Sequence, residues 1–236
     1  MTNDVDLTER ECVVAVDGVW KLFAMGDEVV RALVDVSFDV QRGEFLCLMG
    51  PSGSGKSTVL HLLGGLDRPT KGDIAISGSS TAALTESQFS SLRRSKIGFI
   101  FQSYNLIPFL SALENVELPL TFEPLDRQSV RKRAIDLLEL VGLGHRLHHR
   151  PSRMSGGEQQ RTAIARALIG SPALILADEP TANLDQRSGG TIVDLLQELC
   201  QQLGVTVVAS THDPTVAAKA SRVLRMADGR IVEEAA

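Results

Sequence analysis

The residues from 50 to 57 have the types and spacing of a loop that binds phosphate groups. The full GxxxxGK[ST] pattern lies between a predicted strand and a predicted helix, in Gly50-Pro51-Ser52-Gly53-Ser54-Gly55-Lys56-Ser57. Glycines let a backbone wrap a phosphate, while successive N–H groups and a helix N-terminus supply positive potential. We expect Lys56 to reach the β- and γ-phosphates of a nucleotide, Ser57 to bind Mg²⁺ and Thr58 to belong to the same nucleotide site.

Two acidic residues follow a second apolar run. Residues 174–177 have the compact apolar sequence of a buried strand, and Asp178 and Glu179 come directly after them. Ligands bind at the carboxyl ends of parallel strands, so these carboxylates should lie beside the phosphate loop. We expect Asp178 to hold the Mg²⁺ shell and Glu179 to act as the general base that polarises the attacking water.

The elements that must position these residues alternate between strands and helices. Short apolar runs typical of strands occur at residues 32–40, 45–49, 74–76, 174–177 and 205–209. Helices are expected at 58–63 and 189–203, and a closing hairpin is expected at 223–226 and 231–232. Such alternation predicts an α/β fold with a mostly parallel sheet.

The middle of the chain has a different, helical texture. Residues 88–94 and 127–141 are expected to form helices, whereas residues 102–120, with Pro108 and Pro119, are expected to be irregular. We therefore expect a helical insertion over about 87-168 within a single domain of residues 1-236.

A motif of small residues ahead of the 174–177 strand resembles that of a known family. Met154-Ser155-Gly156-Gly157-Glu158-Gln159 is similar to the LSGGQ signature of ABC ATPases, with Met for Leu and Glu for the last Gln. The resemblance covers nearly the whole chain and implies a P-loop NTPase (RecA-like) core with an antiparallel β subdomain and an inserted helical subdomain. In that family two copies share each ATP site. Ser155, Gly156 and Gly157 should therefore contact the ATP held by the partner's phosphate loop.

The resemblance assigns roles to three further residues. Gln102 matches the Q-loop, which in the family contacts Mg²⁺ and the attacking water and senses the membrane partner. Asp185 matches the D-loop, which crosses the dimer interface. His212 follows the predicted strand at 205–209 and matches the switch histidine, which contacts the γ-phosphate.

An aromatic side chain is expected to hold the adenine base. The family uses a ring from its N-terminal strand pair, which makes Phe23 the candidate and Trp20 the competing ring. A phenyl ring can stack on the base but has no hydroxyl group to offer. The alternative for either ring is an ordinary place in the core.

Composition argues against several other classes of protein. The net charge of -5 and the aromatic content of 4% give no indication of nucleic-acid binding. No apolar run approaches the ~18 residues of a membrane helix, and the N-terminal residues resemble no targeting peptide. Cys12, Cys47 and Cys200 lie far apart, which favours a reducing compartment, with Cys47 in the core. No metal site is expected at the histidines that lack nearby acidic or thiol partners: His145, His148 and His149.

A transporter motor and a soluble ABC ATPase that acts on DNA or ribosomes are the two main alternatives. The stretch between Lys56 and Ser155 is too short for the long coiled coils of chromosomal members and shows no sustained heptads. Ribosome-acting members usually carry two ATPase domains, and this chain has one. A nucleotide kinase or GTPase would share only the phosphate loop.

Residues 97–108 and 114–120 resemble the macrolide-export and lipoprotein-release subfamily. That resemblance implies a homodimer of ATPase subunits, bound peripherally at the cytoplasmic face of the inner or plasma membrane to an integral-membrane permease with an extracytoplasmic domain. A cell-division relative works similarly without evident transport. Residues 106–110 are the expected docking surface for the permease, and the alternative for them is ordinary core. The sequence does not identify the transported substrate.

Overall fold

A six-stranded sheet forms the centre of the molecule. The computed structural model describes residues 11–26 and 28–235. The strands of this sheet are, in spatial order, β10 (Arg230–Ala235), β9 (Arg222–Ala227), β3 (Phe45–Met49), β8 (Thr206–Thr211), β7 (Leu174–Asp178) and β6 (Ile97–Ile100). All neighbours are parallel except β9 and β10, which form the expected closing hairpin. The prediction of a mostly parallel α/β fold is confirmed.

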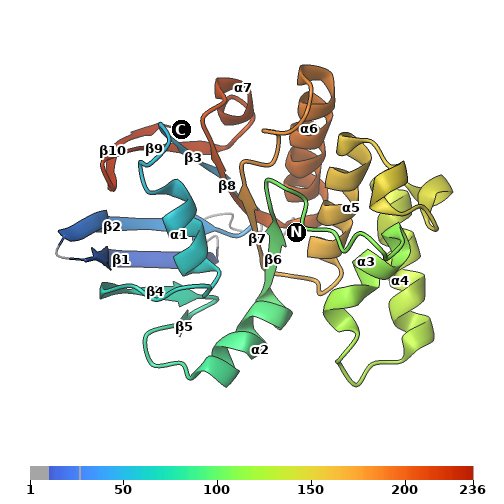
Figure 1. The fold of residues 1–236 in the computed structure, drawn as a ribbon. Helices are drawn as coiled ribbons and strands as arrows, with labels where there is room; N and C mark the ends of the chain where they lie inside the picture. Colours follow the sequence, from blue (N-terminus) through green and yellow to red (C-terminus); the bar gives the residue numbers. More distant parts are fainter. Residues whose placement is uncertain (1–10, 27, 236) are drawn as a thin grey trace, which may run out of the picture.

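A second, antiparallel sheet lies beside the first. Its spatial order is β2 (Glu28–Gln41), β1 (Cys12–Met25), β4 (Lys71–Ile76) and β5 (Ser79–Ser80). The pairing of β1 with β2 changes register at several points along its length. These irregularities explain why the sequence near residues 15–23 has a mixture of strand-like and turn-like residues. Figure 1 shows this sheet at the left of the molecule.

Helices cover both faces of the central sheet. They are α1 (Lys56–Leu63), α2 (Glu86–Lys96), α3 (Ala112–Glu117), α4 (Arg127–Leu140), α5 (Gly156–Leu168), α6 (Gln186–Leu203) and the short α7 (Pro214–Ala217). Three 3₁₀ turns, η1 (Leu118–Leu120), η2 (Gly144–Arg146) and η3 (Pro151–Arg153), join the helices of the middle region. Figure 1 shows α3, α4 and α5 together at the right, as a helical subdomain.

Alternate side chains of β7 point into two separate hydrophobic cores. Leu174 and Leu176 pack in the core that contains α1 and the antiparallel sheet. Ile175 and Ala177 pack in the core that contains α5, α6 and the helical subdomain. Because successive residues of a strand face opposite sides, α1 and α5 cover opposite faces of the central sheet.

The expected helical insertion over about 87-168 also contains a strand of the core. β6 lies within this range and pairs in parallel with β7, from Ile97 opposite Leu174 to Ile100 opposite Ala177. Ile100 is fully buried, and Ile97 is 8% exposed. The run is only four residues long and follows directly on α2, so its sequence alone does not separate it from the helices around it. The helical part of the insertion therefore follows β6 as well as preceding it.

One prediction from composition, the burial of Cys47, can be compared with the fold. Cys47 is fully buried in β3, as expected, and burial raises the pKa of its thiol to about 12. The part of the chain that the structure describes holds no cluster of three or more potential metal ligands. Within residues 11–26 and 28–235, no helix combines the length and the apolar character that a membrane crossing requires.

Candidate functional site

The loop between β3 and α1 has a backbone that only glycine can follow at several points. Gly53 and Gly55 have φ angles of 81° and 103°, which L side chains rarely adopt. A Cβ at Gly55 would lie 2.8 Å from the carbonyl oxygen of Ala32, and one at Gly50 would lie 2.3 Å from that of Met226. The glycines thus let β2 and β9 pack directly against the loop.

Lys56 begins α1 and folds back over this loop. Its side chain is buried, and its ammonium group donates to the carbonyl oxygens of Gly50 at 2.8 Å and Pro51 at 2.9 Å. The positive charge is therefore held beside the backbone that should receive the phosphates. A cavity of about 390 Å³ borders the loop and is lined by Met49, Gly50, Pro51, His212, Arg225, Met226 and Val232.

Oxygen atoms from three elements meet beside the start of α1. The Ser57 hydroxyl donates to Asp178 Oδ1 at 3.0 Å, and the Ser210 hydroxyl donates to the same oxygen at 2.6 Å. β7 and β8 place Asp178 directly opposite Ser210. Carboxylate and hydroxyl oxygens are the ligands that Mg²⁺ takes in such sites, so Ser57 and Asp178 fit the predicted metal position. Ser210, which we did not predict, orients the carboxylate.

Glu179 leaves the end of β7 in an unusual backbone conformation. Its φ is 45°, in the left-handed region that few non-glycine residues occupy. Its N–H group donates to the carbonyl and hydroxyl oxygens of Ser210, at 3.1 and 3.2 Å. These contacts hold a strained turn at the point where a general base is expected, and such strain is found preferentially at functional sites.

The carboxylate of Glu179 points at His212. The distance from His212 Nδ1 to a Glu179 oxygen is 3.0 Å, and the Glu179 side chain is only 16% exposed, against 66% for His212. The histidine therefore fixes a largely buried carboxylate and keeps one face of its own ring open. The structure brings together Lys56, Ser57, Asp178, Glu179 and His212, as the sequence predicts.

Gln102 and Asp185 are placed differently from these residues. The Gln102 carbonyl accepts a hydrogen bond from Asn183 at 2.9 Å, and among the described residues no hydrogen bond joins its side chain to Ser57 or Glu179. Asp185 caps the N-terminus of α6 by accepting from the Ser188 N–H at 3.0 Å. The Ser188 hydroxyl also donates to Asp185, and these bonds lower the pKa of the Asp185 carboxyl. Nucleotide contact by either residue stays a prediction.

The segment after Gln102 is held rigidly. Tyr104 and Asn105 have φ angles of 62° and 48°, and the Arg166 guanidinium donates to both of their carbonyl oxygens. Asn115 is fully buried, and its amide bonds the backbone of Ile107 in both directions. The expected docking segment at 106–110 is therefore pre-formed.

Ser155, Gly156 and Gly157 lie at the N-terminus of α5. The Ser155 hydroxyl accepts from the Glu158 N–H at 3.2 Å, and a Glu158 oxygen accepts from the Ser155 N–H at 2.8 Å. This reciprocal capping box explains how glutamate serves in place of the last glutamine of the motif. A Cβ at Gly156 would lie 2.8 Å from the Tyr104 hydroxyl, so this glycine is required for close packing. The atoms nearest to that Cβ position belong to Tyr104, Asn183 and Leu184, and none of these residues is part of the phosphate loop.

The two candidate rings differ in exposure. Phe23 on β1 is 38% exposed, and the Lys21 ammonium lies 4.9 Å from the centre of its ring. Trp20 is half-buried, with the Lys71 ammonium 5.7 Å from its ring. Phe23 pairs across to Val30, two positions before Ala32, whose carbonyl touches the phosphate loop. The exposed ring on the strand pair nearest the loop is the better platform for a base.

Phe23→Ala should therefore weaken ATP binding, by about fivefold to a hundredfold, because base–aromatic stacking contributes roughly 1–3 kcal/mol. Titration of a fluorescent ATP analogue measures the change. Phe23→Trp should restore binding, and Trp20→Ala is the matched control. If Trp20→Ala weakens binding and Phe23→Ala leaves it unchanged, the assignment of the ring is reversed.

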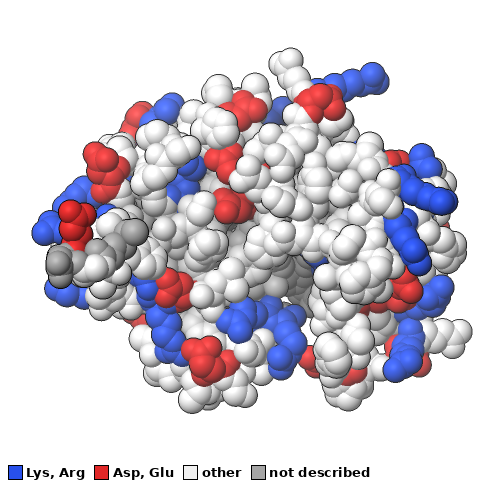
Figure 2. All heavy atoms as spheres, viewed as in Figure 1, with Lys and Arg blue, Asp and Glu red and all other residues white. Residues whose placement is uncertain are grey.

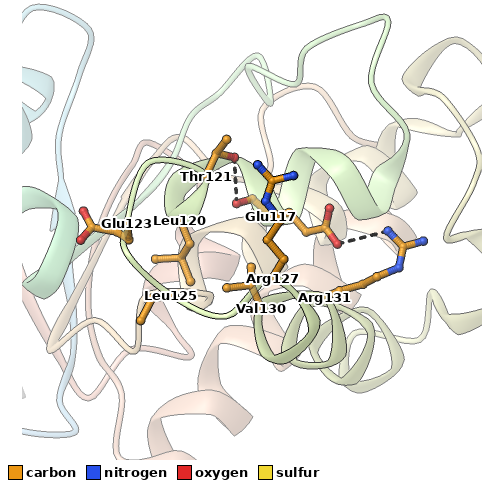
Figure 3. A pocket seen from close by; sticks show the side chains of 8 residues that line it. All are labelled: Glu117, Leu120, Thr121, Glu123, Leu125, Arg127, Val130 and Arg131. Atoms are coloured by element: carbon orange, nitrogen blue, oxygen red, sulfur yellow. Dashed lines mark hydrogen bonds and ion pairs between the residues drawn. The ribbon is translucent and has the colours of Figure 1, made fainter.

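A cavity of about 440 Å³ lies elsewhere, in the helical subdomain between η1 and α4. Figure 3 shows that its wall combines apolar side chains with an ion pair in which the Arg131 guanidinium lies 3.5 Å from Glu117. Burial raises the pKa of the Glu117 carboxyl. This cavity is not lined by glycines, and none of the residues predicted to bind ATP or Mg²⁺ lines it. The cavity at the phosphate loop, by contrast, is lined by residues predicted for nucleotide binding, Gly50, Pro51 and His212.

Comparisons with known proteins agree with this geometry. Residues 33–182 match the family model described as ABC transporter. An uncharacterized ABC transporter ATP-binding protein of Thermotoga maritima is 51% identical over 90% of this chain and 91% of its own length. The macrolide export ATP-binding/permease protein MacB 1/2 of Paracoccus denitrificans is 49% identical over 92% of this chain, which spans only 32% of that protein.

A solved structure has a similar fold. It is the dimeric structure of a post-hydrolysis state of the ATP-binding cassette MJ0796, bound to ADP and Pi, a protein of Methanocaldococcus jannaschii. The TM-score is 0.87 at 45% sequence identity, over 94% of this chain and 97% of that one.

Proposed function

Because the chain belongs to the ABC transporter ATP-binding family, we propose that two copies, head to tail, enclose two Mg-ATP and drive a separate membrane permease. The chain itself is the ATP-binding and ATP-hydrolysing subunit of a transporter. The residues gathered at the ends of β3, β7 and β8 supply the hydrolytic half of each site.

Each residue of that half has a role that follows from its position. The backbone of residues 50–55 and the Lys56 ammonium bind the phosphates, and Ser57 with Asp178 would hold Mg²⁺. Mg²⁺, when bound, neutralises charge that develops on the phosphate oxygens. Glu179 accepts the proton of the attacking water, and His212 holds its carboxylate in place and can donate toward the γ-phosphate.

The observation that carries the dimer is the separation of the two halves of the site. The phosphate loop precedes α1 on one face of the central sheet, whereas Ser155–Gly157 begin α5 on the other face. We therefore infer that the two halves around one ATP come from different chains. A two-fold pair satisfies both, since each phosphate loop can meet the partner's α5 N-terminus. The dimeric relative bound to ADP and Pi supports this arrangement.

A mixture of two inactive variants tests the shared site. Lys56→Ala removes the phosphate loop's charge, and Ser155→Arg blocks the small-residue turn at the start of α5. Each variant alone should be inactive, but a mixed dimer has one site with both lesions and one intact site. Mixing equal amounts should leave about a quarter of all sites intact and give about a quarter of the wild-type rate, measured as phosphate release. A mixture as inactive as its components would contradict the shared site.

The proposed permease contact includes the docking segment at residues 106–110. Phe109 in the docking segment is 69% exposed, unlike a core residue. A neighbouring cavity of about 270 Å³ is lined by residues of α2, β6 and α5, including Arg93, Arg94 and Arg166. Figure 2 shows basic side chains gathered over α2, beside a hollow toward the helical subdomain. An exposed apolar side chain such as Phe109, together with a cavity lined by arginines, can receive a helix end that carries acidic and apolar residues.

The relatives named for macrolide export combine an ATP-binding part with a permease in one protein. By that analogy the partner of this chain is an integral-membrane permease with an extracytoplasmic domain, and the chain works peripherally at the cytoplasmic face of the membrane. The transported substrate is determined by the permease.

A further inference from the structure

Glu158 is bonded from two sides at the start of α5. Its Oε2 accepts from the Ser155 N–H at 2.8 Å, and its Oε1 accepts from Arg146 Nε at 2.9 Å. The Glu158 side chain is only 14% exposed. The bond from the Ser155 backbone, with the charge of Arg146, lowers the pKa of the Glu158 carboxyl, so this group is ionised. The turn at Ser155 is therefore held by one oxygen of the Glu158 carboxylate, while the other oxygen bonds Arg146.

Arg146 is itself fixed by its surroundings. It ends η2, and its NH1 lies 3.1 Å from His149 Nε2. A guanidinium has no acceptor, so His149 must accept this bond and carry its own proton on Nδ1. The backbone around these residues is tied to the start of α3, since the Ala112 N–H donates to the His149 carbonyl at 2.8 Å. The position of Arg146 is thus fixed by η2 and by the start of α3, and not by α5.

We propose that Arg146 is a positioning residue of the shared ATP site, which holds Glu158 so that Ser155 and the first turn of α5 face the partner's phosphates. This inference rests on the head-to-tail dimer proposed above. This role requires no contact between Arg146 and ATP. Its guanidinium fixes the Glu158 side chain in one rotamer, and Glu158 in turn fixes the Ser155 backbone through its N–H. The orientation of the first turn of α5, whose N–H groups face the γ-phosphate, then follows.

The choice of glutamate makes the turn depend on this arginine. A glutamine at position 158 could still close the capping box, because its carbonyl oxygen can accept from the Ser155 N–H. It would not need a cation at its other end. A glutamate at 14% exposure does need one, since a carboxylate without its partner is costly to bury. Loss of Arg146 should therefore be worse with Glu158 present than with glutamine in its place.

The test measures dimer formation in the hydrolysis-impaired Glu179→Gln background, by analytical sedimentation in the presence of Mg-ATP. Arg146→Met should weaken the dimer about tenfold, as expected for a lost charge-assisted hydrogen bond. ATP affinity of the monomer should not change, because the phosphate loop is untouched. Arg146→Lys should recover part of the loss. Arg42→Met is the matched control, since Arg42 forms a comparable pair with Glu11 at 2.7 Å on the surface.

A double variant separates positioning from general destabilisation. Arg146→Met combined with Glu158→Gln should dimerise better than Arg146→Met alone, because no unpaired carboxylate remains. The proposal is overturned if Arg146→Met dimerises like Arg42→Met, or if the effects of Arg146→Met and Glu158→Gln simply add. If the Glu179→Gln parent stays monomeric with Mg-ATP, the proposed function fails first, and this inference with it.

Discussion

Replacing Lys56 by alanine should abolish ATP hydrolysis and weaken ATP binding by at least about a hundredfold, as expected for loss of a fixed charge in a preorganised site. The side chain is 6% exposed, and its ammonium is held within 2.9 Å of two carbonyl oxygens of the phosphate loop. No other ammonium or guanidinium group of the described residues bonds this loop in the same way. Water cannot replace a positive charge that is already in position when the phosphates arrive.

Calorimetric titration with ATP and measurement of phosphate release test the Lys56→Ala prediction. Lys219→Ala is the matched control, because Lys219 forms only an exposed pair with Asp194 at 3.0 Å. The melting temperature of both variants shows whether each remains folded. Hydrolysis by Lys56→Ala at a rate close to that of the Lys219→Ala control would contradict the role of Lys56.

Glu179→Gln should lower the rate of hydrolysis by about 10²-fold or more while leaving ATP affinity nearly unchanged. The substitution keeps the size of the side chain and its position near His212, but an amide cannot accept the proton of the attacking water. The phosphate contacts of Lys56 and the oxygens of Ser57 and Asp178 are not altered. ATP should therefore bind, persist and hold the dimer closed.

Single-turnover assays with radiolabelled ATP measure this loss without interference from product release. Glu86→Gln is the matched control, because it replaces a carboxylate by an amide in the same way, at an exposed ion pair between Glu86 and Arg68. A Glu179→Gln variant that hydrolyses ATP as fast as Glu86→Gln would exclude Glu179 as the base. Another group, with His212 the nearest candidate, would then have to activate the water.

The parts of the site that the sequence predicts best are those that one short segment specifies. The glycines of residues 50–55 are required by the local backbone and by its close packing, so their pattern alone identifies a phosphate loop. Asp178 and Glu179 are predictable because they end a run of four buried apolar residues. In both cases the chemistry and the structure that supports it lie next to each other in the chain.

The parts that the sequence did not predict depend on contacts between distant segments. Ser210 orients Asp178 only because β8 pairs with β7 in one particular register, which no local pattern determines. β6 falls within the predicted helical insertion. What makes it a strand is its pairing with β7, which joins residues far apart in the chain and is not visible in the local sequence. The link from Arg146 to Glu158 likewise needs the fold of the loop between η2 and α5. For Ser210, the one local signal is a serine directly after the apolar run at residues 205–209.

The shared ATP site is tested most directly by the mass and the ATP content of Glu179→Gln in solution, measured together by light scattering and nucleotide analysis with saturating Mg-ATP. We predict a particle of twice the monomer mass with one ATP per chain, and a monomer with bound ATP when Ser155→Arg is added. A Glu179→Gln chain that binds ATP fully but remains monomeric, or that dimerises equally well with Ser155→Arg, would contradict the account.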